Sequence, residues 1–268
     1  MTDDQATTSG PLAGKNCVVM GIQNRWSIAY AIAEALAGAG ARIAVTYVDD
    51  RAKRDADALI AATPGAAGYS CNVEADEDLD ALGTALRDEF GRVDTLVHSI
   101  GYAPAAELQN RFLETTRQGW NTTLGISAYS LVAAAQRVVP LMTDGGSIIT
   151  MTYLGATRAF PRYNVMGVAK AALEANVRYL AADLGEQRIR VNAISAGPIK
   201  TAAARGIPGF GDMHGQLLDH APLKVPFGQP QVATTALFLA SDAAASITGQ
   251  TLFVDNGYSI MGMSSTPG

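Results

Sequence analysis

Tyr163 and Lys170 are the residues with the clearest catalytic potential in this sequence, because they place a phenol and an ammonium group near each other along the chain. Their separation of seven positions is about two turns of an α-helix, so both side chains would lie on one helix face. A lysine in that place can lower the pKa of the phenol from about 10 and can hold a ribose hydroxyl. The same spacing also occurs where a tyrosine packs and a lysine is a surface cation, so a catalytic role requires a nucleotide site nearby.

A turn suited to a phosphate group runs from Gly21 to Ala29, directly after a short apolar strand. A glycine in this place lets the backbone approach a pyrophosphate, and the helix that follows offers unpaired N–H groups and a positive dipole end. The usual Gly-x-Gly-x-x-Gly pattern is missing, because only Gly21 remains and Ser27 stands where a later glycine is expected. An ordinary strand-to-helix turn is the alternative, but the position after the first strand favours a nucleotide site.

Two acidic residues, Asp49 and Asp50, follow the second predicted strand, where the ribose of an adenosine would lie. A carboxylate there can accept hydrogen bonds from the ribose hydroxyls and would repel a 2′-phosphate, so NADH is favoured and NADPH disfavoured. The alternative is that Asp49 or Asp50 caps the following helix by accepting from its free N–H groups. Arg51 could also restore phosphate binding.

Alternating strand and helix patterns surround these residues and predict a doubly wound Rossmann fold of the α/β class, with a seven-stranded parallel sheet and helices on both faces. Since no linker or repeat occurs within 12–263, one catalytic domain is expected there, between polar tails at 1–11 and 264–268. The predicted strands span residues 16–20, 42–47, 67–71, 94–98, 147–151, 188–194 and 251–254, and the predicted helices span 27–37, 51–62, 76–90, 117–142, 163–185 and 229–240.

The composition of the 268-residue chain narrows the possible functions. Hydrophobic residues make up 48% of the chain and form no continuous run of about twenty, so no membrane span is expected. The formal charge of −5 shows no excess of positive charge that would favour binding to nucleic acid. The first eleven residues lack the regions of a secretory signal, and Cys17 and Cys71 stand far apart without metal-ligand spacing. We therefore expect a protein of the reducing cytoplasm, with no disulfide and no metal site.

Taken in series, these motifs resemble the short-chain dehydrogenase/reductase superfamily and, within it, the enoyl-acyl-carrier-protein reductases. The phosphate turn has the form Gly-x5-Ser-Ile-Ala, and Tyr153 joins Tyr163. The segment His98-Ser-Ile-Gly101 replaces the usual Asn-Asn-Ala-Gly after the fourth strand, and Thr150 stands where ordinary ketoreductases carry a serine. The resemblance covers about 12–263 and includes the segments 190–201 and 252–258.

The resemblance implies a cytoplasmic homotetramer that reduces the 2,3 double bond of trans-2-enoyl thioesters on acyl carrier protein with NADH, in fatty acid elongation. Tyr163, Tyr153 and Lys170 would be catalytic. Val48 lacks a polar group for adenine, and Asn72 replaces an expected aspartate. The residues implied in cofactor binding are Gly21, Ser27, Ile28, Val48, Asn72, Val73, Ile100, Lys170, Ile199, Lys200, Thr201, Ala202 and Ala203. Those implied in substrate binding are Ala103, Tyr153, Tyr163, Met166 and Phe210, with a mobile substrate loop at 200–220.

As a hypothesis, hydride transfer to the β carbon of the enoyl group leaves negative charge on the thioester oxygen, and the Tyr163 hydroxyl donates a hydrogen bond to that oxyanion. The first alternative is a carbonyl reductase or alcohol dehydrogenase on the same fold, in which Tyr163 protonates an alkoxide. The second is an idle dinucleotide-binding module that acts as a sensor or scaffold, against which the two tyrosines and the lysine argue. His98, His214 and His220 are not spaced as a metal site.

Overall fold

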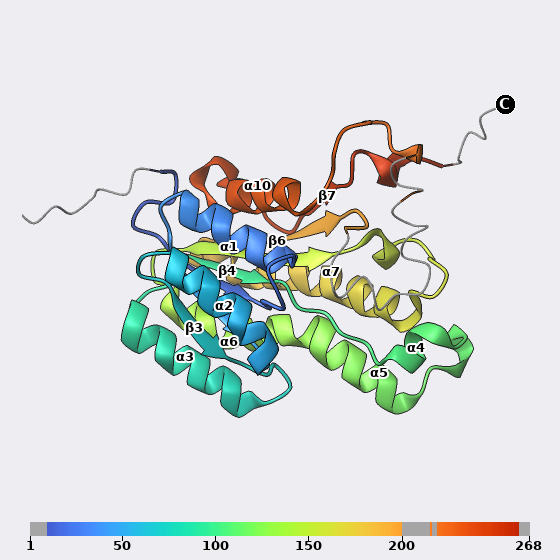
Figure 1. The fold of residues 1–268 in the computed structure, drawn as a ribbon, viewed down its shortest axis with the longest axis horizontal. Coiled ribbons are helices and arrows are strands. Elements are labelled where there is room, and N and C mark those ends of the chain that lie inside the picture. The colour runs from blue at the N-terminus through green and yellow to red at the C-terminus, as the bar shows by residue number, and fades with distance from the viewer. Residues whose placement is uncertain (1–9, 200–214, 216–218, 263–268) are drawn as a thin grey trace, which may run out of the picture.

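A seven-stranded parallel sheet forms the centre of the protein in the computed structural model, which describes residues 10–199, 215 and 219–262 (Figure 1). The strand order is β3-β2-β1-β4-β5-β6-β7, so the order reverses beside β1 and β4, where doubly wound sheets bind ligands. The predicted fold class and parallel direction are confirmed. The strands are β1 (Asn16–Met20), β2 (Arg42–Tyr47), β3 (Ala67–Ser70), β4 (Thr95–His98), β5 (Gly146–Thr152), β6 (Ile189–Ala196) and β7 (Thr251–Val254).

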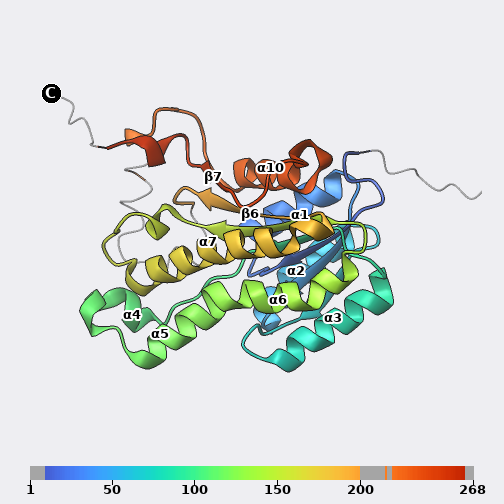
Figure 2. The same cartoon turned by 180° about the vertical axis from the view of Figure 1, so that it is seen from behind.

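Helices cover both faces of the sheet, as the alternating pattern predicted. The described helices are α1 (Ile28–Gly38), α2 (Asp50–Ala62), α3 (Asp76–Phe90), α4 (Ala105–Gln109), α5 (Arg117–Leu124), α6 (Ser130–Val138), α7 (Asn164–Leu184) and α10 (Gln229–Ala240). One buried cluster joins α1, α2 and α10 to the sheet, and Figure 1 shows these helices in front. A second joins α3, α6 and α7 to the opposite face, which Figure 2 shows. The central strands are therefore buried on both sides, which explains their continuous apolar runs.

The helix predicted over 117–142 is helical throughout most of its length but is not one regular α-helix. A π-helical turn at Gly125–Tyr129 separates α5 from α6, and a 3₁₀ turn follows at Val139–Leu141. Within the π turn, the Ser127 hydroxyl accepts from the Tyr102 N–H and donates to the Tyr102 carbonyl, each at 2.9 Å. Turns of this kind often mark functional positions, and here the turn holds the loop that leaves β4.

The stretch Arg117–Leu141 is also long and apolar enough to cross a membrane by length and composition. It is the one such stretch in the described part of the chain, and 56% of its most apolar segment is buried inside the fold. Core helices pass the same test, and the residues of α6 belong to the cluster between α3, α7 and the sheet.

Both cysteines are buried and carry free thiols, in agreement with the expectation from their spacing. Burial raises the pKa of Cys17 to about 12 and that of Cys71 to about 11. Thiols with such pKa values are poor nucleophiles near neutral pH, so the two side chains serve as packing groups.

Candidate active site

Gly21 and Ile100 meet at the carboxyl ends of β1 and β4, where the strand order reverses. Gly21 has a φ of 98°, which side chains rarely adopt, and a Cβ on it would collide with the Ser99 carbonyl oxygen. The same Cβ would lie 3.2 Å from Cγ1 of Ile100. Gly21 therefore lets the backbone after β1 pack closely against the backbone after β4, while its contact with a pyrophosphate stays a prediction.

Ser27 forms the start of α1 and turns the positive end of that helix toward the same edge. Its hydroxyl accepts from the Tyr30 N–H at 3.2 Å and donates to the Asn24 carbonyl at 2.8 Å. The first turn of α1, which begins at Ile28, contains no acidic residue, so the dipole of the helix is not neutralised there. Ser27 therefore acts as an N-cap, and the first turn that it shapes is suited to an anion.

One of the two acidic residues after β2 caps the following helix. The Asp49 side chain accepts from the Ala52 N–H at 2.7 Å and so caps α2, while a hydrogen bond from Asp49 or Asp50 to a ribose stays a prediction. Val48 beside it is 56% exposed, and Asn72, two residues after β3, uses its side-chain oxygen to accept from the Glu74 N–H at 3.2 Å. Val48 and Asn72 thus follow neighbouring strands at the edge where an adenine would lie, while their contact with a cofactor stays a prediction.

Lys170 lies inside the protein, beneath the loop that follows β4. Its ammonium group donates to the Met151 carbonyl at 2.9 Å, and a Cβ on Gly101 would lie 3.4 Å from Nζ. Burial lowers the pKa of Lys170 from 10.5 to about 8, and Glu174 opposes this shift. The side chain therefore remains mostly protonated at neutral pH and is fixed next to the backbone of Gly101.

Tyr163 stands immediately before α7, with its phenol inside the protein and only 6% of the residue exposed. Its ring lies 5.0 Å from the ring of Tyr153, in an edge-on arrangement. Burial raises the pKa of Tyr163, and Tyr153 adds to the effect. The expectation that Lys170 lowers this pKa is therefore wrong, because desolvation dominates and the lysine is not among the groups that shift it. The phenol remains a neutral hydrogen-bond donor.

The predicted substrate residues within the described chain gather around Tyr163. A third buried cluster combines residues from the loop after β4, from α4 and from the first turns of α7. Its surface is apolar, which suits an acyl chain. Leu108 and Phe160 also belong to this cluster and were not predicted, because neither residue is part of a recognisable motif. The buried members are Ala103, Leu108, Tyr163, Val165, Met166 and Ala169, with Leu124, Tyr153 and Phe160 packed against them.

Two further features near the tyrosines were not predicted. A Cβ on Gly155 would approach the Tyr163 ring to 2.5 Å, so the absence of a side chain there creates the seat for that ring. Burial raises the pKa of Tyr153, and Tyr258 and Asp255 raise it further. The carboxylate of Asp255 in turn accepts from the N–H groups of Gly257 and Ser259, at 2.9 and 2.8 Å. The turn after β7 therefore completes this side of the site.

Several residues singled out in the sequence lie away from Tyr163 or outside the described residues. Ile199 is buried in the cluster on the α1 and α10 face. No group of three or more metal-binding side chains occurs in the described part of the chain. His98 is buried, 2.9 Å from the Thr150 hydroxyl and 2.8 Å from that of Ser130, and burial lowers its pKa to about 3. Lys200, Thr201, Ala202, Ala203, Phe210, His214 and most of the predicted loop at 200–220 fall outside the described residues.

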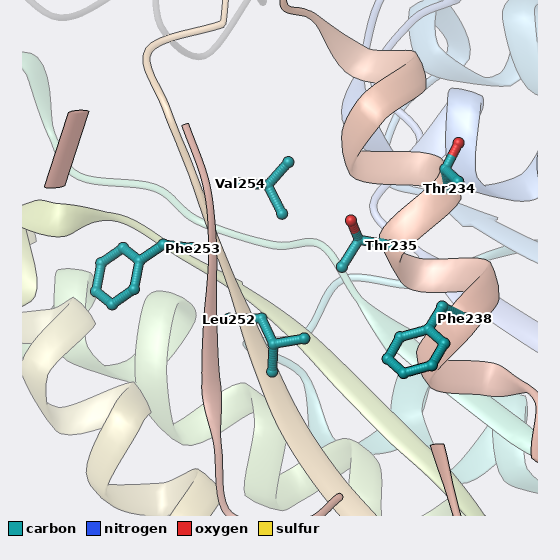
Figure 3. Close-up of a pocket in the computed structure, with 6 residues that line it drawn as sticks. All are labelled: Thr234, Thr235, Phe238, Leu252, Phe253 and Val254. Atoms are coloured by element: carbon teal, nitrogen blue, oxygen red, sulfur yellow. The ribbon is translucent and has the colours of Figure 1, made fainter. Parts of the chain in front are cut away.

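Two open grooves on the outer surface contain none of the predicted site residues. One, of about 410 Å³, lies between α10 and β7, where Thr235 and Phe238 face Leu252 (Figure 3). The other, of about 510 Å³, lies on the outer side of α6 and α7 and is lined in part by Tyr179 and Leu180. The predicted catalytic tyrosines therefore lie in the apolar cluster around Tyr163 and not in these grooves.

Comparison with known proteins assigns the chain to a family. A family model described as enoyl-(acyl carrier protein) reductase matches residues 21–259. The chain is 49% identical over 255 residues to the NADH-dependent enoyl-[acyl-carrier-protein] reductase of a Nostoc species, and the match covers 94% of this chain and 99% of the relative.

Solved structures agree with this match. The Bacillus cereus enoyl-acyl carrier protein reductase with NADP+ and indole naphthyridinone has a TM-score of 0.92 and 43% identity, covering 95% of this chain and all of the other. The reductase of Anaplasma phagocytophilum in complex with NAD has a TM-score of 0.92 and 40% identity, covering 97% and 99%. These findings confirm the expected family and its class of oxidoreductase. The chain belongs to the enoyl-(acyl carrier protein) reductase family.

Proposed function

We propose that this protein reduces the carbon–carbon double bond of trans-2-enoyl thioesters carried on acyl carrier protein, with NADH as the reductant. The observation that carries this proposal is the buried Tyr163 phenol in an apolar cluster, next to Tyr153 and directly before the helix that holds the buried Lys170. The apolar cluster suits an acyl chain and the phenol supplies one polar group, which together match an acyl thioester.

The residues of the chain fit a nicotinamide dinucleotide at the carboxyl ends of β1 and β4. The backbone at Gly21 and the first turn of α1 would hold the pyrophosphate, and Lys170 would hold the nicotinamide ribose. When bound, NADH supplies the hydride that reduces the double bond. Asp49 and Asp50 lie where a 2′-phosphate would be repelled, so NADH is preferred over NADPH.

Tyr163 stabilises the charge that develops on the substrate. As the β carbon is reduced, negative charge collects on the thioester oxygen, and a donor fixed beforehand at that position lowers the barrier. The raised pKa of Tyr163 keeps its hydroxyl protonated and able to donate. Lys170 keeps its ammonium group near Gly101 through the bond to the Met151 carbonyl.

The test compares crotonyl and acetoacetyl thioesters with NADH and with NADPH, under identical conditions. Oxidation of NADH with the crotonyl thioester, and little with the acetoacetyl thioester, supports the proposal. Faster reaction with the acetoacetyl thioester would instead indicate a carbonyl reductase. NADH binding without turnover on either compound would indicate a binding module. Faster oxidation of NADPH than of NADH would reject the cofactor preference.

We further propose that the protein is a cytoplasmic homotetramer with one catalytic domain over 12–263. Two separate faces of the described chain carry exposed aromatic residues, and a tetramer with two kinds of two-fold interface needs two such faces. The exposed Tyr179 lines the groove on the outer side of α6 and α7, while the exposed Phe238 and Phe253 line the groove between α10 and β7. Sedimentation velocity tests this: a monomer at micromolar concentration would contradict it.

A further inference from the structure

We propose that Asn164 is a positioning residue for the Tyr163 phenol, because its side-chain amide ties the start of α7 to α4. The inference deepens the proposed function and rests on it for the effect on turnover. Asn164 touches neither of the other predicted catalytic groups through a hydrogen bond in the described structure, so its role passes through Tyr163.

The backbone around Tyr163 adopts a conformation that needs support. Arg162 and Asn164, on either side of it, both have positive φ values, 64° and 43°. Residues other than glycine adopt this region at a cost of about 1–3 kcal/mol each, and asparagine tolerates it better than most. With one such residue on each side, the backbone at Tyr163 is held in a particular conformation, and this conformation sets the direction in which the phenol points.

The Asn164 amide supplies the support. Its Nδ2 donates to the Glu107 carbonyl at 3.1 Å and to the Asn110 carbonyl at 2.8 Å, so one amide group uses both of its hydrogens on one partner segment. These carbonyls lie at the end of α4, where a helix has no N–H groups of its own to satisfy them. Asn164 therefore closes the end of α4 and binds it to the start of α7, two elements that lie side by side in Figure 2.

The partner segment is itself anchored, which makes the tether stiff. The Glu107 carboxylate is buried and accepts from the Thr116 hydroxyl at 2.6 Å and from the Thr116 N–H at 3.2 Å. Thr116 is the N-cap of α5. In the first turn of that helix, the Glu107 side chain occupies the space that a Cβ on Gly119 would need. A carboxylate at the positive end of a helix is favourable.

The tether sets the distance between the two walls of the apolar cluster. Ala103 and Leu108, on the side of α4, face Tyr163 and Met166, at the start of α7, within one buried group. Within the described residues, the hydrogen bonds that join α4 to the start of α7 are those of the Asn164 amide, and the apolar packing that remains without them does not fix a direction. A displacement of the donor by about 1 Å is enough to reduce turnover about a hundredfold.

The Asn164→Gly variant separates the amide from the backbone. Glycine adopts a φ of 43° without strain, so the variant keeps the backbone and removes only the side chain. We expect kcat with a crotonyl thioester to fall about ten- to a hundredfold, while the dissociation constant for NADH changes less than about twofold. Asn164→Asp, which keeps the size but cannot donate, is the second variant if the glycine variant does not fold. Arg188→Gly is the matched control, because Arg188 has a φ of 60° and precedes β6 at the opposite edge of the sheet.

A double-mutant cycle identifies the route of the effect. If Asn164 acts by placing the Tyr163 hydroxyl, adding Asn164→Gly to a Tyr163→Phe variant lowers kcat by less than about twofold further. An equal loss in both backgrounds, or a glycine variant with the kcat of the wild type, would overturn the proposal. A loss of the same size in Arg188→Gly would also overturn it.

Hydrogen exchange of the segment 103–116 provides a readout that does not depend on turnover. The tether predicts faster exchange of the α4 amides in Asn164→Gly than in the wild type, with no change in Arg188→Gly. A wild type that does not reduce enoyl thioesters rejects the proposed function. Unchanged exchange in Asn164→Gly rejects the tether, whatever the wild type reduces.

Discussion

The buried ammonium group of Lys170 predicts a particular dependence of stability on pH. Its pKa is lowered from 10.5 to about 8 by burial in the folded protein, while the unfolded chain keeps the ordinary value. Between these two values the folded state binds fewer protons than the unfolded state, so stability rises as the pH increases through this window. Lys170→Met replaces the side chain by an apolar one of similar length without a titrating group, and the variant therefore lacks this rise.

The size of the effect follows from the shift. At about 1.36 kcal/mol per pKa unit, the change from 10.5 to about 8 corresponds to about 3 kcal/mol. Linkage assigns about 2 kcal/mol of this to the interval from about pH 7 to about pH 9.5. We expect the free energy of unfolding of the wild type to increase by that amount relative to Lys170→Met. Loss of the bond to the Met151 carbonyl lowers the stability of the variant equally at both pH values, so it cancels.

Urea titrations of the cofactor-free protein, followed by tryptophan fluorescence at one protomer concentration, measure this difference. Lys53→Met is the control, because Lys53 is exposed on α2 and paired with Asp57. The pKa of Lys53 is raised, so its contribution is present across the whole interval and is lost only at higher pH. A wild-type advantage over Lys170→Met that stays constant from about pH 7 to about pH 9.5 would refute the reasoning.

Three further predictions concern the site and its surroundings. Tyr163→Phe lowers kcat about a hundredfold, the typical cost of one oxyanion donor, and leaves the NADH dissociation constant unchanged in a fluorescence titration. Gly21→Ala meets the Ser99 carbonyl and weakens NADH binding more than tenfold, whereas Gly38→Ala, with open space around it, binds NADH as the wild type does. His98, with its pKa lowered from 6.5 to about 3, stays neutral at about pH 5, so its contribution to stability is lost only as the pH falls from about 6.5 toward 3. A ring-proton NMR shift of His98 that titrates near pH 6.5 would contradict the last prediction.

The boundaries of the main elements follow from local patterns, and the structure reproduces them closely. The strands β1, β2 and β7 and the helices α3 and α10 have the predicted limits. For β1 and β2 such agreement is expected, because a strand that is buried on both faces has an apolar run that ends where burial ends. The π turn at Gly125–Tyr129 has no such signal, since it depends on the bonds between Ser127 and a loop that is distant along the chain.

The active site also combines features that the sequence predicted with features that it did not. The spacing of Tyr163 and Lys170 predicted one shared helix, but only Lys170 lies on α7, in its second turn, while Tyr163 lies immediately before the helix. Both residues are buried. The direction of the tyrosine pKa did not follow from spacing, because the dielectric around a side chain is created by neighbours from other elements. Asp49 shows the same limit: a carboxylate after a strand suits a cap and a ribose equally well until the helix beside it is in place.

From the order of the residues alone, the doubly wound sheet, the glycine at the end of β1 and the phenol–ammonium pair at the start of α7 could be derived, because each depends on neighbours along the chain. The meeting of α4 with α7 through Asn164, the seat of the Tyr163 ring over Gly155 and the low pKa of Lys170 required the folded protein. These features arise from contacts between segments tens of residues apart, and close packing is what brings such segments within bonding distance and removes the water between them.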